Sequence, residues 1–109
     1  MATSKQIAKF GTELTFDTAT LTGSFVAFSS PLVENPALII FDNQSNTTVV
    51  ISDDGVTNSK TFVAGEALVI DNRSDASIAV ELTWPVGTNF YASGTAGVGL
   101  FRISYVYAK

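Results

Sequence analysis

The segment LFRISYVYA, Leu100–Ala108, gives the clearest indication of the fold class. Large apolar or aromatic side chains recur in it at every second position: Phe101, Ile103, Tyr105 and Tyr107. The opposite stripe holds Arg102, Ser104 and Ala108, with Val106 as its apolar exception. Because successive side chains of a β-strand point to opposite faces, this pattern predicts a strand with one face in a core.

Other segments carry the same kind of signal. Ser77–Trp84 alternates even more cleanly, with Ile78, Val80, Leu82 and Trp84 on one face, and Pro85 ends it. Ala37–Phe41 is continuously apolar, which predicts a central strand covered on both faces. Shorter strands are expected at Gln6–Phe10, Glu13–Phe16, Ser24–Ser29, Thr47–Ser52, Thr61–Ala64 and Ala67–Asp71.

Turn residues between these segments suggest how the strands are connected. Asp42–Asn46 is expected to let Thr47–Ser52 pair with Ala37–Phe41. The run GTAG at 94–97 is expected to supply the positive-φ glycines of a hairpin between Asn89–Ser93 and the final strand. The roughly eight to ten strands predict a single all-β domain over residues 1–109, a two-sheet antiparallel β-sandwich that is jelly-roll-like.

The composition favours a folded chain whose surface carries little charge. Hydrophobic residues make up 46% of the 109 residues, ample material for a core. Charged residues make up 15%, against about a quarter in an ordinary soluble domain. Fewer charges would lose water on association, so part of the surface is expected to be an interface, including one between copies of the chain.

Several function classes are excluded or disfavoured. The chain has no cysteine and no histidine, which removes thiolate metal sites and histidine-activated nucleophiles, so we expect no enzyme and no cofactor. The six basic residues are scattered in a chain of net charge −4, which disfavours nucleic acid as a partner. Met1–Phe10 lacks the apolar run of a signal peptide and no segment is long enough to span a membrane, so synthesis in the cytoplasm and no membrane partner are expected.

The acidic and glycine-rich segments are best explained as turns. Asp53 and Asp54 are adjacent before Gly55, whereas glycosidase chemistry needs two carboxylates that face each other. The spaced oxygen ligands of a calcium loop are also missing around them. Gly94, Gly97 and Gly99 precede no helix, so they do not form a phosphate loop. No catalytic or metal-binding residue is therefore predicted.

Four aromatic residues are of the type that stacks on sugar rings: Trp84, Tyr91, Tyr105 and Tyr107. Trp84 and Tyr105 continue apolar stripes, so strand periodicity favours the core for both. Tyr91 is the least constrained of the set. It is our candidate for an aromatic residue that contacts a ligand or a partner protein.

The order of the strand and turn segments resembles that of small all-β structural proteins of tailed bacteriophages. The segments that carry the resemblance are Gly11–Phe16, Gly23–Phe28, Ala37–Asn43, Val50–Thr57, Phe62–Gly65, Gly87–Tyr91 and Phe101–Tyr107. The resemblance implies a virion component made in the bacterial host cytoplasm, of the head decoration, cement or neck type. Its implied partners are the major capsid protein, other virion proteins and further copies of itself.

Two functional hypotheses follow from these observations. The first is a head decoration or cement protein that stabilises or decorates the capsid, with a neck or tail position as its variant. The second is a carbohydrate-binding module for attachment to a cell surface, motivated by the aromatic residues. The family has no catalytic motif, so no site residues follow from the resemblance.

Overall fold

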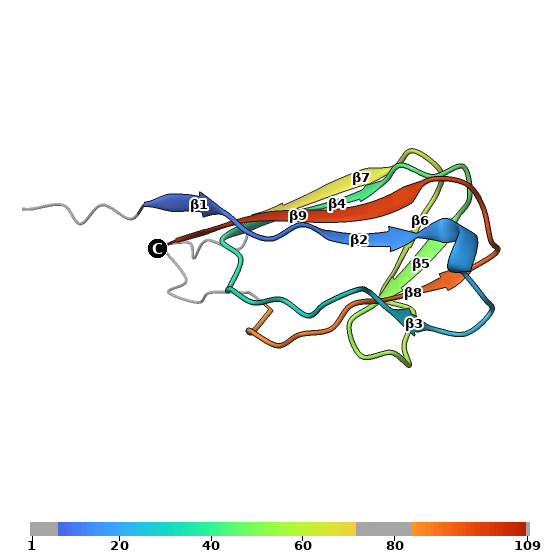
Figure 1. Cartoon of the computed structure of the whole chain (residues 1–109), viewed down its shortest axis with the longest axis horizontal. Coiled ribbons are helices and arrows are strands. Elements are labelled where there is room, and N and C mark those ends of the chain that lie inside the picture. The colour runs from blue at the N-terminus through green and yellow to red at the C-terminus, as the bar shows by residue number, and fades with distance from the viewer. Residues whose placement is uncertain (1–6, 72–83, 109) are drawn as a thin grey trace, which may run out of the picture.

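A computed structural model of the chain, which describes residues 7–71 and 84–108, consists of two antiparallel β-sheets packed face to face (Figure 1). The strands are β1 (Ala8–Phe10), β2 (Leu14–Asp17), β3 (Val26–Ala27), β4 (Leu38–Asn43), β5 (Val49–Ser52), β6 (Lys60–Phe62), β7 (Ala67–Asp71), β8 (Tyr91–Gly94) and β9 (Leu100–Ala108). A short 3-10 turn, η1 (Thr18–Thr20), follows β2. The prediction of an all-β, two-sheet antiparallel sandwich is confirmed.

The larger sheet is built around β9. Its strand order is β1-β9-β4-β7, and β2 also pairs with β9. Both β1 and β2 are antiparallel to β9: Phe10 lies opposite Val106 at one end of the strand and Phe16 opposite Phe101 at the other. The alternating stretch at the C-terminus therefore forms the longest strand described and the centre of this sheet.

The smaller sheet has the strand order β3-β8-β5-β6. Val49 and Ile51 of β5 and Ala92 of β8 point into the sandwich and are buried. β5 and β6 form a hairpin in which Val49 lies opposite Phe62. This sheet supplies the second wall of the core.

Side chains from the inner faces of both sheets form one hydrophobic cluster. Phe101 and Ile103 are fully buried, as the alternating stripe predicts, and Tyr105 is 2% exposed. Phe101 contacts Phe28 and Phe62 edge-on, which joins the larger sheet to the smaller one. Each such ring stabilises the fold by about 1.5–3 kcal/mol through burial.

The predicted pairing of Ala37–Phe41 with Thr47–Ser52 is wrong. β4 lies in the larger sheet between β9 and β7, and β5 lies in the smaller sheet between β8 and β6. The intervening turn carries the chain across the sandwich. Asn43, the last residue of β4, is buried, and its side chain donates hydrogen bonds to the carbonyls of Thr47 and Phe62, next to β5 and in β6. These bonds favour a crossover over a hairpin.

The predicted hairpin between Asn89–Ser93 and the final strand is also wrong. β8 and β9 belong to different sheets. Gly94 and Gly99 do have positive φ, at 147° and 121°, but their loop is held by η1: the Gly97 N–H donates to the Thr18 carbonyl, and the Thr18 N–H donates to the Gly99 carbonyl. The glycines therefore lie where the chain crosses from the smaller sheet to the larger one.

The segment Ala37–Phe41 is central in its sheet but is covered on one face. Ile39 and Phe41 are buried, whereas Leu38 and Ile40 on the opposite face are half-buried. No other element among residues 7–71 and 84–108 lies over that face (Figure 1). The continuous apolar run therefore reflects an apolar outer surface and not a fully enclosed strand.

Two parts of the sequence predictions lie outside the described residues: Gln6 and positions 77–83 of the predicted strand Ser77–Trp84. Trp84 itself is described and packs on the core. No helix in the described ranges is long and apolar enough to cross a membrane.

Candidate binding surfaces

Tyr91, the aromatic candidate from the sequence, begins β8 opposite Ser52 of β5 and is half-buried. Its ring lies over Gly55, where φ is +76° and an added Cβ would come within 3.2 Å of the ring carbon Cζ. Part of Tyr91 is therefore fixed against the turn between β5 and β6. The remaining exposed part is available to a ligand or a partner, and its role stays a prediction.

Asp54 holds that turn in place. Its Oδ1 accepts hydrogen bonds of 2.8 Å from the N–H groups of Val56 and Thr57 and from the Ser52 hydroxyl. The backbone bond from Thr57, then that from Val56, then the Ser52 bond hold the pKa of Asp54 well below its ordinary value. This geometry supports a structural role for the Asp53–Gly55 segment.

Asp53 takes part in a different group, around Trp84. The Trp84 Nε1–H donates to Asp53 Oδ2 at 3.0 Å. The indole packs edge-on against Phe41 and Phe90, at centroid distances of 5.7 and 5.4 Å. Trp84 is half-buried at the rim of the core, so its predicted core contact is present but incomplete.

A pocket of about 290 Å³ opens beside Trp84, between the edge strands β6 and β7 of the two sheets. Its apolar wall includes Phe41 and Leu68, and its polar lining includes Asp53, Ser59 and Lys60. Lys60 Nζ forms a 2.9 Å ion pair with Glu66, which together with the Val63 N–H lowers the pKa of Glu66. Lys60 and Asp53 are distant from Trp84 in the chain, so no local sequence signal placed them together.

Tyr105 is a core residue with one polar contact. Its hydroxyl donates to Glu34 Oε1 at 2.7 Å, which ties the loop before β4 to β9. Burial, followed by the hydrogen bond to the Glu34 carboxylate and its negative charge, raises the pKa of Tyr105 to about 12. Tyr107 is half-buried, with its ring 6.5 Å from that of Tyr105. Neither Glu34 nor this contact was identified from the sequence.

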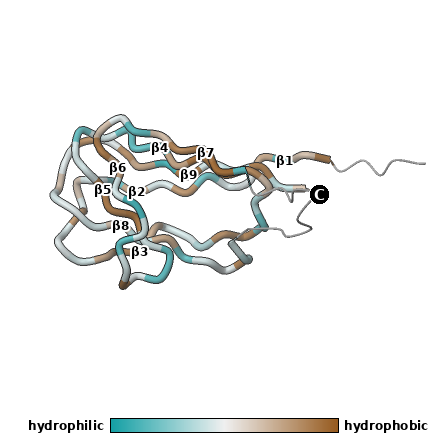
Figure 2. Tube along the Cα trace, turned by 180° about the vertical axis from the view of Figure 1, so that it is seen from behind, coloured by the Kyte–Doolittle hydropathy of each residue, from teal (hydrophilic) through white to brown (hydrophobic). Residues whose placement is uncertain are grey.

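The outer face of the larger sheet has an apolar half, which we call the apolar patch: Phe10, Leu38, Ile40, Val69 and Val106. The strand register makes these residues neighbours, because Val106 lies opposite both Phe10 and Leu38, and Ile40 lies opposite Val69. Phe10 is 89% exposed and Val69 57% exposed. In Figure 2 the hydrophobic colour on β4, β7 and β9 continues toward the end where β1 lies.

The other half of the outer face is polar, and its charged groups have partners. Arg102 Nη1 contacts Glu13 Oε1 at 2.6 Å, and Arg102 Nε donates to Gln44 Oε1 at 2.8 Å. Ser104 donates to the second oxygen of Glu13, and the Gln44 amide donates to Asp42 Oδ2. This half can therefore come close to another surface without leaving these side chains unpaired.

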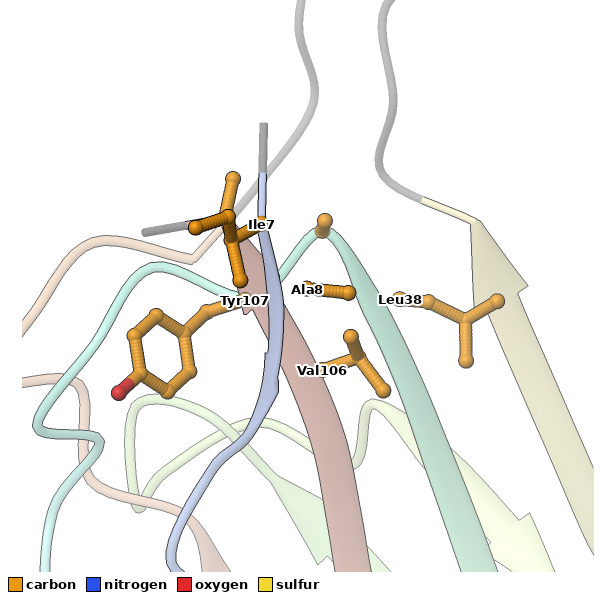
Figure 3. Close-up of a pocket in the computed structure, with 7 residues that line it drawn as sticks. Ile7, Ala8, Leu38, Val106 and Tyr107 are labelled. Carbon is orange, nitrogen blue, oxygen red and sulfur yellow. The ribbon is translucent and has the colours of Figure 1, made fainter. Parts of the chain in front are cut away.

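A hollow of about 360 Å³ lies at the end of the sheet next to the apolar patch. Ala8, Leu38 and Val106 line it from three adjacent strands. In Figure 3 these three side chains project on one side of the sheet, whereas Ile7 and Tyr107 point to the other. The alternation of Leu100–Ala108 identifies Val106 as an apolar residue on the polar face. That Val106 lies next to Phe10 follows from the pairing of β1 with β9, which the local sequence does not predict.

Comparison of the chain with protein-family models, curated proteins and solved structures finds no match. Within the described ranges, no group of three or more Asp and Glu side chains is placed to hold a metal ion.

Proposed function

We propose that this chain is a non-enzymatic structural protein of a tailed-bacteriophage virion, most specifically a head decoration or cement protein that binds the major capsid protein. A position at the neck or tail is the variant of this proposal. The observation that carries it is the outer face of the larger sheet, with exposed apolar side chains in one half and internally paired charges in the other. Such a face is suited to contact with another protein.

We also infer that the sandwich is a jelly roll. The strand orders β1-β9-β4-β7 and β3-β8-β5-β6 support this, because the chain passes repeatedly from one sheet to the other. Double-sheet jelly rolls occur in viral capsid proteins, as well as in lectins and other families, so the fold supports the proposal without selecting it. The resemblance to phage structural proteins and the low charged fraction of 15% add to it.

The proposal is tested on the particles of the phage that encodes the chain. Density-gradient fractions of purified particles are expected to contain the chain by mass spectrometry. Recombinant chain is expected to co-sediment with shells that lack it. Particles without the chain, together with a recombinant protein that never co-sediments, would contradict the proposal.

Labelling with a gold-conjugated antibody separates the two positions on the particle. Label distributed over the head supports a decoration or cement role. Label confined to the junction of head and tail, or to the tail, supports the neck or tail variant.

The Trp84 pocket favours a second candidate, a carbohydrate-binding module for cell-surface attachment. Trp84, Asp53 and Lys60 line one pocket, and aromatic rings with nearby polar groups are suited to sugar rings. Under this candidate the protein binds a subset of glycans on an array and Trp84→Ala abolishes binding, whereas Tyr91→Ala, outside the pocket, retains it. An array without signal would remove this candidate.

A further inference from the structure

The apolar patch and the hollow beside it form a protruding and a recessed part of the same surface. Phe10 is 89% exposed, and it lies opposite Val106, whose side chain lines the hollow. Ala8, two residues before Phe10 on β1, lines the hollow as well (Figure 3). An exposed aromatic ring therefore stands directly beside an apolar recess.

We propose that the outer face of the larger sheet binds a second copy of this chain in a two-fold symmetric dimer, in which Phe10 of each copy enters the hollow of the other. The inference deepens the proposed virion role, on which it rests, by naming the first partner of this face. In a two-fold interface one patch meets an identical patch, so a single protrusion and a single recess satisfy both copies.

The hollow is large enough for the ring. Its volume is about 360 Å³, whereas a cavity of about 150 Å³ already holds a benzene molecule. Its lining by Ala8, Leu38 and Val106 is apolar. Buried aromatic anchors that fill a pocket on the partner are the residues that typically dominate binding free energy.

The size of the face is that of a small dimer interface. β9 has nine residues, which at about 3.3 Å per residue makes the face about 30 Å long. The other strands of this sheet are shorter, so at about 4.8 Å between strands the face covers roughly 400–450 Å² in projection. The accessible area exceeds the projection because side chains protrude, and it stays below the roughly 800 Å² per partner of a standard interface, so a dimer of modest affinity is expected.

The charges of the polar half permit this contact, and the exposed Asp71, opposite Leu38, lies on the edge strand β7, at the rim of the face. Arg102, the cation of the polar half, is already paired with Glu13 and hydrogen-bonded to Gln44 on its own chain. Packing two such sheets face to face, about 10 Å apart, repeats the arrangement that the two sheets adopt within each copy. The outer faces would then form a second, intermolecular core.

The test is analytical ultracentrifugation of the full chain and three variants. Wild type is expected to be a dimer. Phe10→Asp is expected to weaken dimerisation by roughly a hundredfold or more, because two equivalent rings lose their burial. Ala8→Trp is expected to weaken it too by filling the hollow, although it adds apolar surface. Val56→Asp, an 81% exposed position on the β5–β6 turn, is the matched control and is expected to dimerise as wild type does.

The two substitutions at the patch separate a specific contact from general stickiness. If exposed apolar area alone caused association, Ala8→Trp would strengthen it. A far-ultraviolet spectrum checks that each variant keeps its β-sheets, and Phe10→Ser replaces Phe10→Asp if the charge prevents folding. A monomeric wild type at millimolar concentration, or a dimer unaffected by both patch substitutions, would overturn the inference.

Co-sedimentation with capsid shells distinguishes this failure from failure of the virion role. A monomeric wild type that still binds shells overturns the dimer and leaves the virion role, with the capsid protein as the partner of the face. A wild-type dimer that is sensitive to Phe10→Asp but never binds shells supports the dimer and contradicts the virion role.

Discussion

Asn43 connects the two sheets through a single side chain. It is fully buried at the end of β4, and its Nδ2 donates to the carbonyls of Thr47, Phe62 and Val63 at 2.9–3.2 Å. Its Oδ1 accepts from the N–H and the hydroxyl of Ser45. A residue of the larger sheet thus satisfies backbone groups of the β5–β6 hairpin in the smaller one.

Replacing this side chain tests that role. Asn43→Ala is expected to lower the free energy of unfolding by roughly 2–4 kcal/mol, because several buried polar groups lose their partner at once. Asn58→Ala, at an exposed position of the β5–β6 loop, is the control and is expected to change it by less than about 0.5 kcal/mol. Urea denaturation of both variants measures the difference. Equal stabilities would show that Asn43 does not hold the sheets together.

Tyr105 makes stability depend on alkaline pH. Its pKa is raised from 10.0 to about 12 in the folded chain, so the folded state keeps the proton when the unfolded state has lost it. The resulting contribution to stability is fully present below pH 10 and is lost as the pH rises through about 12. The expected result is a decline of wild-type stability over this window that is weaker in Tyr105→Phe.

A spectrophotometric titration checks the same residue directly. The difference in tyrosinate absorbance between wild type and Tyr105→Phe is expected to develop near pH 12. If half of this absorbance difference has already developed at pH 10, the pKa of Tyr105 is not raised. That result would contradict both its burial and its contact with Glu34.

At the scale of elements, alternation in the sequence identified the strands better than it identified their pairing. β9 was predictable because Phe101, Ile103 and Tyr105 recur at every second position and are buried. The partners of β4 and β5 were not, because short intervening turns are compatible with both a hairpin and a crossover. Contacts such as those of Asn43, which involve residues about twenty positions later, decide between the two.

The candidate surfaces were predictable to a smaller extent. Tyr91 and Trp84 were singled out by residue type, and the structure places each against a turn or the core rim. Phe10 and Lys60 were not, because their surroundings come from strands far away in the chain. Exposure on a sheet face is set by which neighbours cover it, and the local sequence does not contain that information.

The crossing from β8 to β9 depends on glycine. At Gly99, φ is +121° and an added Cβ would lie 2.7 Å from the Gln44 carbonyl oxygen. Gly99→Ala is therefore expected to destabilise the chain by roughly 1–3 kcal/mol. At Gly23 nothing lies within 4 Å of an added Cβ, so Gly23→Ala is expected to be neutral within about 0.5 kcal/mol. Thermal unfolding distinguishes the two variants, and equal melting temperatures would contradict this account of the loop.

At the scale of the whole molecule, the two sheets differ in what their outer faces present. The smaller sheet covers the inner face of the larger sheet. Half of the outer face of the larger sheet is apolar, and Phe10 and Val69 are exposed there. Burying this face would add apolar area to that already enclosed, so we expect the isolated chain to gain stability on assembly. The thermal midpoint should therefore rise with protein concentration in wild type and less in Phe10→Asp.

The most direct test of the proposed role is a cryo-electron microscopy map of the particle that contains the chain. We expect density for the two-sheet sandwich in regular copies, with the outer face of β9, β4 and β7 covered by a second copy or by a capsid subunit. A map in which every copy of the chain leaves that face exposed to solvent would contradict this expectation.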